Sequence, residues 1–214
     1  MPIGDLRHVI ISRPNEFAKW SRAFQESVHF VVSGDIVRAR GVFTRIDADA
    51  LMYWFHLTAQ NAARDRLALL SQVDPVEYVR TGSSGTKLRM PSRAAKLNAL
   101  VRDNWSCRYC DSPLLLKDDF HKFRQLLGEE LIPLGRTNLT THGTKFLHFA
   151  TFDHLEPHVL GGDSSLDNIV SSCYACNFGK YRYTLEELRL LPPVEGIYSP
   201  KRMWIRTVEG LRAL

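Results

Sequence analysis

The stretch FDHLEPHVLGGDSSLDNIVSSCYACNFGK, residues 152–180, decides how the rest of the sequence is interpreted. It opens with an adjacent acid and histidine, Asp153 and His154, and its last third contains a Cys-x-x-Cys pair, Cys173 and Cys176. A Gly-Gly turn, Gly161 and Gly162, and an asparagine, Asn168, lie between these two groups. Neither a hydrophobic core nor a solvated surface requires this combination, so the stretch indicates a functional site.

The cysteines predict a metal centre. A second Cys-x-x-Cys pair, Cys107 and Cys110, lies upstream, and the two pairs account for all four cysteines in the chain. Four thiolates in this pattern suit one tetrahedral zinc ion, which would hold the fold and leave no open position for a substrate. Two disulfides, a redox-active pair and unrelated buried cysteines are the alternatives. Disulfides need an oxidising compartment, whereas the sequence shows no signal peptide, and a redox pair would not need a second copy.

The placement of apolar residues and turn formers in 152–180 predicts a strand, a loop, a second strand and a helix. The expected elements are a strand at 152–155, a glycine turn and loop at 161–165, a strand at 168–170 and a helix at 173–180. Folded in this order, the stretch brings Asp153, His154 and Asn177 to one place.

Motif, order and spacing together resemble the HNH endonuclease family, whose ββα-metal motif holds one divalent ion against a scissile phosphate. The resemblance covers Met90 to about Tyr183. It includes PSRAAKLNALVRDNWSCRYC, residues 91–110, which is similar to the basic helix and first zinc knuckle of members with paired cysteines. The implied fold is α+β, with a helical N-terminal region followed by a zinc-stabilised ββα-metal nuclease core.

The resemblance also implies a role for each residue of the motif. His154 matches the general base that takes a proton from the attacking water, and its ordinary pKa of about 6.5 suits that task. Asp153 matches a ligand of the catalytic ion, and Asn168 matches the asparagine that ties the loop to the strand and orients the histidine. Asn177 matches a second ligand, at a position where many members have histidine. Its amide oxygen favours hard ions such as Mg²⁺ or Mn²⁺, whereas we interpret His158 as an ordinary loop residue.

An excess of basic residues favours a nucleic-acid partner. The chain has 28 lysines and arginines against 23 aspartates and glutamates, which gives a net charge of +5. Ser92 is expected to cap a helix from Arg93 to about Asp103 whose outer face is basic. Beside a phosphodiesterase motif, contacts with a DNA backbone explain such a face better than solvation alone. The residues expected to contact nucleic acid are Arg93, Lys96, Arg102, Lys180 and Arg182.

The chain is expected to consist of two parts. Residues 1–85 predict a helical region to which no role is assigned, and residues 86–214 predict the nuclease domain. An insertion at about 113–150 is expected to add a helix at 118–127 and a strand at 145–151. No apolar run reaches the length of a membrane span, and with no signal peptide the expected location is the cytoplasm.

These observations predict an enzyme that hydrolyses phosphodiester bonds in DNA, with a catalytic Mg²⁺ or Mn²⁺ ion and a structural zinc ion as cofactors. A zinc-stabilised nucleic-acid-binding module without activity is the main alternative, but a binder has no use for a general base such as His154. A thiol-redox protein is a third possibility, which the nuclease motif disfavours. The sequence does not distinguish duplex, single-stranded or branched DNA, or RNA, as the substrate.

Overall fold

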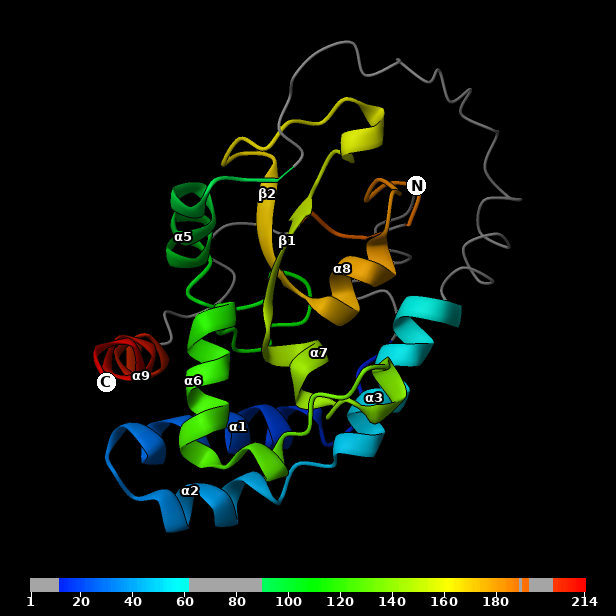
Figure 1. Cartoon of the computed structure of the whole chain (residues 1–214). Coiled ribbons are helices and arrows are strands. Elements are labelled where there is room, and N and C mark those ends of the chain that lie inside the picture. Colours follow the sequence, from blue (N-terminus) through cyan, green and yellow to red (C-terminus); the bar gives the residue numbers. More distant parts are fainter. Residues whose placement is uncertain (1–11, 62–89, 189, 193–201) are drawn as a thin grey trace.

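The structure, a computed structural model, describes residues 12–61, 90–188, 190–192 and 202–214. These residues form a mixed fold in which one two-stranded sheet is surrounded by helices (Figure 1), so the expected α+β class with a helical N-terminal part is confirmed. Among the described helices, none combines the length and the apolar character that crossing a membrane requires. The elements are α1 (Phe17–Val32), α2 (Ile36–Phe43), α3 (Ala48–His56), η2 (Leu57–Asn61), α5 (Arg93–Arg102), α6 (Lys117–Leu127), η3 (Glu129–Leu131), η4 (Asn138–Thr140), α7 (Thr144–His148), β1 (Ala150–His154), η5 (His158–Leu160), β2 (Ile169–Cys173), α8 (Tyr174–Lys180) and α9 (Arg202–Ala213).

Side-chain caps determine where two of the helices begin. The hydroxyl of Ser92 accepts a hydrogen bond from the amide of Ala95 at 3.1 Å, and α5 begins at the next residue, as predicted. Asp47 caps α3 in the same way, by accepting from the amide of Ala50 at 2.9 Å. Each cap satisfies an amide that has no partner inside its helix, so short polar residues set these boundaries locally.

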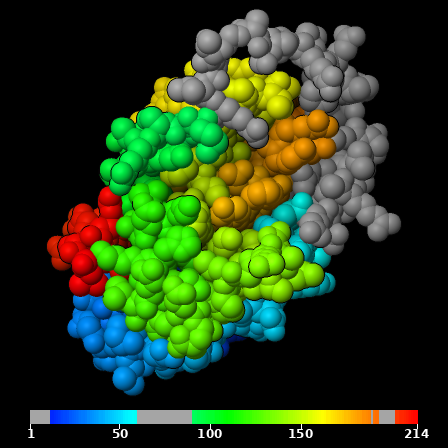
Figure 2. All heavy atoms as spheres, viewed as in Figure 1, coloured from blue at the N-terminus to red at the C-terminus, as the bar shows by residue number. Residues whose placement is uncertain are grey.

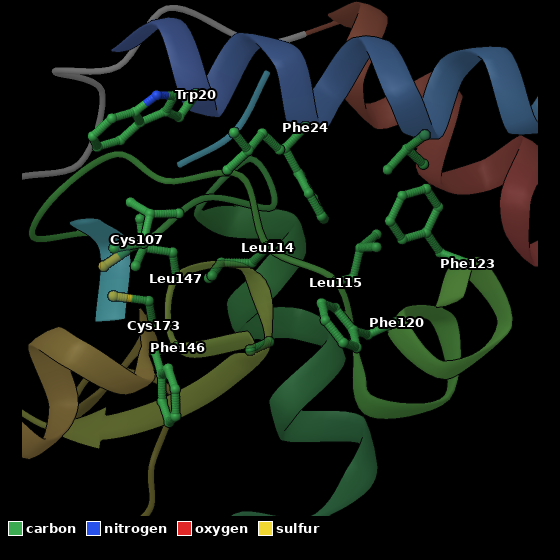
Figure 3. Close-up of a cluster of buried hydrophobic side chains, with 14 of the residues drawn as sticks. Trp20, Phe24, Cys107, Leu114, Leu115, Phe120, Phe123, Phe146, Leu147 and Cys173 are labelled. Carbon is green, nitrogen blue, oxygen red and sulfur yellow. The ribbon is translucent and has the colours of Figure 1, made fainter. Parts of the chain in front are cut away.

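One hydrophobic core joins the N-terminal helices to the rest of the described chain. The fully buried ring of Phe24 in α1 stacks on the His148 imidazole of α7, with 3.8 Å between ring centroids. The same ring meets Phe123 of α6 edge-on at 5.4 Å and lies 6.1 Å from Trp204 of α9. Figure 3 shows Phe24 pointing from α1 toward these inner elements. The predicted boundary between the two parts of the chain lies outside the described residues, so the division into two domains stays a prediction.

The insertion differs in part from its prediction. The helix expected at 118–127 is confirmed as α6, whereas the strand expected at 145–151 is wrong in its first half, which forms α7. The helical turn stacks Phe146 on Phe55 of α3, with 4.0 Å between centroids and 12° between planes. Gly143 precedes the turn and packs so closely on α3 that a Cβ atom there would lie 2.2 Å from a backbone oxygen. This packing against α3 therefore overrides the local preference for a strand.

The sheet is a two-stranded antiparallel hairpin followed directly by a helix, which confirms the predicted strand, loop, strand and helix order. Its register pairs Asp153 with Val170 and His154 with Ile169. Every residue of β2 is buried, whereas β1 has partly exposed positions. Figure 1 shows α8 beside β1 and α5 on the other side of the hairpin.

The stability of this fold is expected to depend on pH through His142. Its ring lies 5.4 Å from that of Phe43, and burial lowers the pKa of the imidazole from 6.5 to about 4. Because the folded pKa lies below the unfolded one, the stabilising contribution is complete above pH 6.5 and is lost as the pH falls toward 4. At pH 4.5 the loss is about 2 to 3 kcal/mol.

The measurement for His142 is urea unfolding of the parent and of His142→Gln at pH 7 and pH 4.5. Other titrating groups, the cysteines included, contribute equally to both proteins, so the difference between their pH responses isolates this side chain. The variant should lose less stability than the parent on acidification. Identical losses would show that His142 does not carry the effect, and His29→Gln, an exposed histidine of α1, serves as the control.

Candidate functional site

The four cysteines converge on one buried point. Their sulfur atoms all lie within 4.8 Å of one another, and those of Cys110 and Cys173 are 3.7 Å apart. All four are free cysteines. In a tetrahedral site with Zn–S bonds of about 2.3 Å, neighbouring sulfur atoms are about 3.8 Å apart. The arrangement therefore fits a single metal ion such as zinc, and Figure 3 shows the sulfur atoms of Cys107 and Cys173 facing one another at the edge of the core.

Local backbone geometry presents each pair of thiols. In the first pair, the amide of Asp111 bonds to the carbonyl of Cys107 at 2.8 Å, which closes a tight turn around Cys110. Asp111 holds this turn with a positive φ of 61°. In the second pair, Cys173 ends β2 and caps α8, where its sulfur accepts from the amide of Cys176 at 3.4 Å. A turn thus positions the first pair of thiols, and a strand–helix junction positions the second.

A buried polar cluster lies beside the cysteines. One carboxylate oxygen of Asp153, Oδ2, accepts a hydrogen bond of 2.6 Å from the hydroxyl of Tyr109 and lies 3.4 Å from the ammonium nitrogen of Lys180. The same ammonium group donates to the backbone oxygen of His154 at 2.7 Å. Burial raises the pKa of the Asp153 carboxyl, while the charge of Lys180 and the hydrogen bond from Tyr109 oppose that shift. The sequence alone did not indicate Tyr109, whose only signal is its position between the first two cysteines.

The loop after β1 is fastened by Asn168. Its side-chain oxygen accepts from the amide of Glu156 at 2.8 Å, and its nitrogen donates to the carbonyls of Glu156 and Asp163 at 3.1 and 2.7 Å. Gly162 passes so close to this contact that a Cβ atom would lie 1.9 Å from the Glu156 oxygen. The loop in turn places the hydroxyl of Ser164 3.0 Å from Nε2 of His154. Asn168 therefore holds the loop that orients the histidine ring.

Helix α8 brings the last motif residue to the same place. The side-chain nitrogen of Asn177 donates to the backbone oxygen of Phe152 at 3.3 Å, which turns its amide oxygen away from that carbonyl. One turn later, Lys180 contacts both Asp153 and His154. Helix α8 thus packs against β1 through Asn177 and Lys180, whereas the joint site of Asp153, His154 and Asn177 stays a prediction.

Comparison with known proteins gives one match. The family model described as HNH endonuclease matches residues 140–182, which include α7, both strands and α8. These residues form an HNH domain. The match contains Asp153, His154, Asn168 and Asn177 of the predicted site. No curated protein and no solved structure matches the chain.

The basic residues expected to contact nucleic acid fall into two groups around the HNH domain. Arg93 and Arg182 are exposed, and Lys96 is partly buried with its ammonium group 5.9 Å from the Phe152 ring. In contrast, Arg102 donates to the backbone oxygen of Ile169 at 2.7 Å and pairs with the adjacent Asp103. Arg102 thus helps to hold β2 against α5, a structural role that the sequence did not reveal.

Lys180 also lies elsewhere than expected. The prediction placed its charge against a substrate phosphate, but the side chain is 0 % exposed and its ammonium group already has two protein partners. The structure therefore corrects the expected surface contact to an internal one. The physical reason is that burying a lysine is tolerated only when its charge is paired, and Asp153 supplies that pair.

His158 occupies a position that the loop interpretation did not foresee. Its ring centroid lies 6.1 Å from that of His154, across the mouth of the HNH loop. Its Nε2 atom is buried, and no hydrogen-bond partner within the described part of the chain reaches it. The His158 ring is thus a neighbour of the general-base candidate His154.

Proposed function

We propose that this protein is a metal-dependent HNH endonuclease that hydrolyses phosphodiester bonds of DNA. The observation that supports the proposal is the packing of α8 against β1, in which Asn177 bonds to Phe152 while Lys180 contacts Asp153 and the backbone of His154. A module that only binds nucleic acid would gain nothing from an imidazole oriented in this way, because binding requires no proton acceptor. The match to the HNH family model points in the same direction.

His154 is the proposed general base. The hydroxyl of Ser164 lies 3.0 Å from Nε2, and it accepts the proton of that nitrogen in the active tautomer. The lone pair then lies on Nδ1, where it takes a proton from the attacking water. The water oxygen forms a bond to phosphorus while the bond from phosphorus to the 3′ oxygen breaks, which leaves a 5′ phosphate. A positioned imidazole is the side chain that most often makes this transfer.

Asp153 and Asn177 are the proposed ligands of the catalytic ion. A carboxylate and an amide oxygen suit Mg²⁺ or Mn²⁺, which keep several waters and also bind substrate phosphates. When bound there, the ion would neutralise charge that builds up on the phosphate. Lys180 and Tyr109 both contact Oδ2 of Asp153, so Oδ1 is the oxygen that we assign to the metal. The four cysteines are the proposed ligands of a structural zinc ion, whose need for reduced thiols agrees with a location in the cytoplasm.

Removing the Tyr109 hydroxyl is expected to weaken the binding of the catalytic ion and to leave the zinc content unchanged. The hydroxyl fixes the orientation of the Asp153 carboxylate, and loss of such a supporting contact typically lowers metal affinity about 10- to 100-fold. The measurement is Mn²⁺ binding to Tyr109→Phe by calorimetry without nucleic acid, alongside its zinc content. Tyr53→Phe, which removes an exposed hydroxyl of α3, is the control. Equal Mn²⁺ affinities of the parent and Tyr109→Phe would contradict this role.

The proposed function is tested by incubating the purified protein with supercoiled plasmid, linear duplex, single-stranded DNA and RNA, each with Mg²⁺, Mn²⁺ or EDTA. We expect cleavage of DNA that depends on the divalent ion and stops in EDTA. If the parent binds nucleic acid but cuts none of these substrates with either ion, the non-catalytic binding module is the correct function. Cleavage of RNA alone would correct the substrate class and keep the chemistry.

A further inference from the structure

Helix α8 carries two aromatic residues, Tyr174 and Phe178, on one side. At about 100° per residue, Tyr174, Asn177 and Phe178 fall within one arc of about 100°. The other residues of the helix are buried: Ala175, Cys176, Gly179 and Lys180. The proposed metal ligand Asn177 thus shares its face of the helix with two aromatic rings. In the space-filling view, α8 (orange) lies at the surface between green and yellow segments (Figure 2).

The two rings form the outer end of a stack that begins in the core. Phe178 lies parallel to Tyr174, with 5.6 Å between centroids and 14° between planes. Tyr174 in turn meets Phe149 edge-on at 5.4 Å and Phe146 at 6.5 Å. Phe178 is nevertheless 52 % exposed. The stack therefore ends at the surface with an aromatic ring that is rigidly supported from below.

Tyr181, the residue after α8, adds a second exposed ring at a cost in backbone strain. Its φ of 55° and ψ of −127° belong to a turn position that normally takes glycine. A bulky residue in such a conformation is strained unless the surroundings enforce it. Burial does not explain the choice of tyrosine, because the side chain is 61 % exposed. The strain holds an aromatic ring in solvent directly after Lys180.

Cations lie near Tyr174, on which Phe178 stacks, and near the exposed Tyr181. The ammonium group of Lys145 lies 6.0 Å from the centre of the Tyr174 ring, and the guanidinium group of Arg182 lies 5.8 Å from that of Tyr181. Exposed aromatic rings interleaved with cations are the features that proteins use to bind unpaired nucleic-acid strands, because bases stack on the rings while the cations attract phosphates. A protein partner would explain the apolar area but not the two flanking cations.

We propose that Phe178 and Tyr181 form a stacking platform for unpaired bases next to the scissile phosphate. The inference rests on the proposed nuclease function and specifies its substrate class: a strand that is single or locally unpaired beside the cut. In a regular duplex both faces of every base are covered by neighbouring bases, so only unpaired bases can stack on protein rings. Fully paired DNA is then the poorer substrate.

The test measures binding in EDTA, so that it does not depend on catalysis. Fluorescence anisotropy compares one labelled oligonucleotide, single-stranded and annealed to its complement, for the parent, Phe178→Ala, Tyr181→Ala and Tyr181→Phe. We expect each alanine variant to lose about 10- to 100-fold in single-strand affinity and little in duplex affinity. Tyr181→Phe should bind like the parent, because it keeps the ring. Met203→Ala, which truncates an exposed residue of α9, is the control.

A further variant separates binding from folding. Tyr181→Gly should raise the melting temperature, since glycine adopts the observed backbone angles without strain, and should still lose single-strand affinity. Equal binding of both oligonucleotides by all variants and the parent would overturn the platform and leave a protein contact as the role of the rings. If the parent cuts no nucleic acid but shows the ring-dependent binding, the nuclease function fails and the platform stands. If it cuts and the rings do not matter, only the platform fails.

Discussion

His154→Ala is expected to abolish cleavage. Removal of a general base typically lowers the rate about a hundred- to ten-thousand-fold, and within the described part of the site His154 is the imidazole that β1 and the Asn168-fastened loop hold in place. The fold should survive, because the histidine side chain is only partly buried. Its backbone oxygen, which accepts from Lys180 at 2.7 Å, is present in alanine as well. The measurement is the nicking rate of supercoiled plasmid across a titration of Mg²⁺ and Mn²⁺.

The metal titration separates the base from the ion ligands. Asn177→Ala keeps Asp153, so part of its activity should return at high metal concentration, whereas His154→Ala should not respond. His158→Ala is the matched control, because it removes a second imidazole, in the segment after β1, whose ring lies 6.1 Å from that of His154. Unchanged zinc content and DNA affinity in His154→Ala would show that the loss is chemical. A variant that cuts as fast as the parent would refute the role of His154.

Replacing one cysteine of the metal centre, as in Cys107→Ser or Cys176→Ser, is expected to unfold the HNH domain. Apparent zinc-binding free energies are about 10 to 16 kcal/mol in small zinc domains at pH 7. Whole domains are stable by only about 5 to 15 kcal/mol. All four cysteines belong to the main hydrophobic core, as do Phe146 and Leu147. Loss of the ion would therefore leave buried thiols without their metal at the point where the Cys107–Cys110 turn, β2 and α8 meet.

Circular dichroism, thermal melting and metal analysis test the cysteine variants. The parent should contain about one zinc ion per chain, and the two variants should lack both the ion and the cooperative melting transition. Ser112→Ala removes a hydroxyl 3.2 Å from the Cys110 sulfur without removing a ligand, so it should keep the zinc and melt close to the parent. Freshly purified parent protein that is folded and free of zinc would disprove the structural metal.

The sequence by itself determined the parts of this protein that depend on local rules. Three features were predicted correctly. They are the Ser92 cap with its helix, the order of strand, loop, strand and helix in the HNH segment, and the convergence of the cysteine pairs. The first two follow from residues close together in the chain: a hydroxyl that satisfies a free amide and glycines that turn the loop. The cysteine pairs lie 63 positions apart at Cys110 and Cys173, and their convergence was predicted from the metal-ligand spacing within each pair. The motif residues Asp153, His154 and Asn177 could be assembled because that order leaves few arrangements.

Tertiary structure alone decided how the motif is supported. Tyr109 reaches Asp153 across 44 positions of sequence and Lys180 reaches it across 27, so neither contact has a local signal. The burial of Lys180 has no local signal either. In the sequence it looks like a surface cation, but it is buried because a carboxylate can neutralise its charge. The helical form of α7 also depends on a distant partner, since Phe146 stacks on Phe55 of α3. Contacts between residues far apart in the chain depend on how whole elements pack, and that information is carried by the folded core and not by any short stretch of sequence.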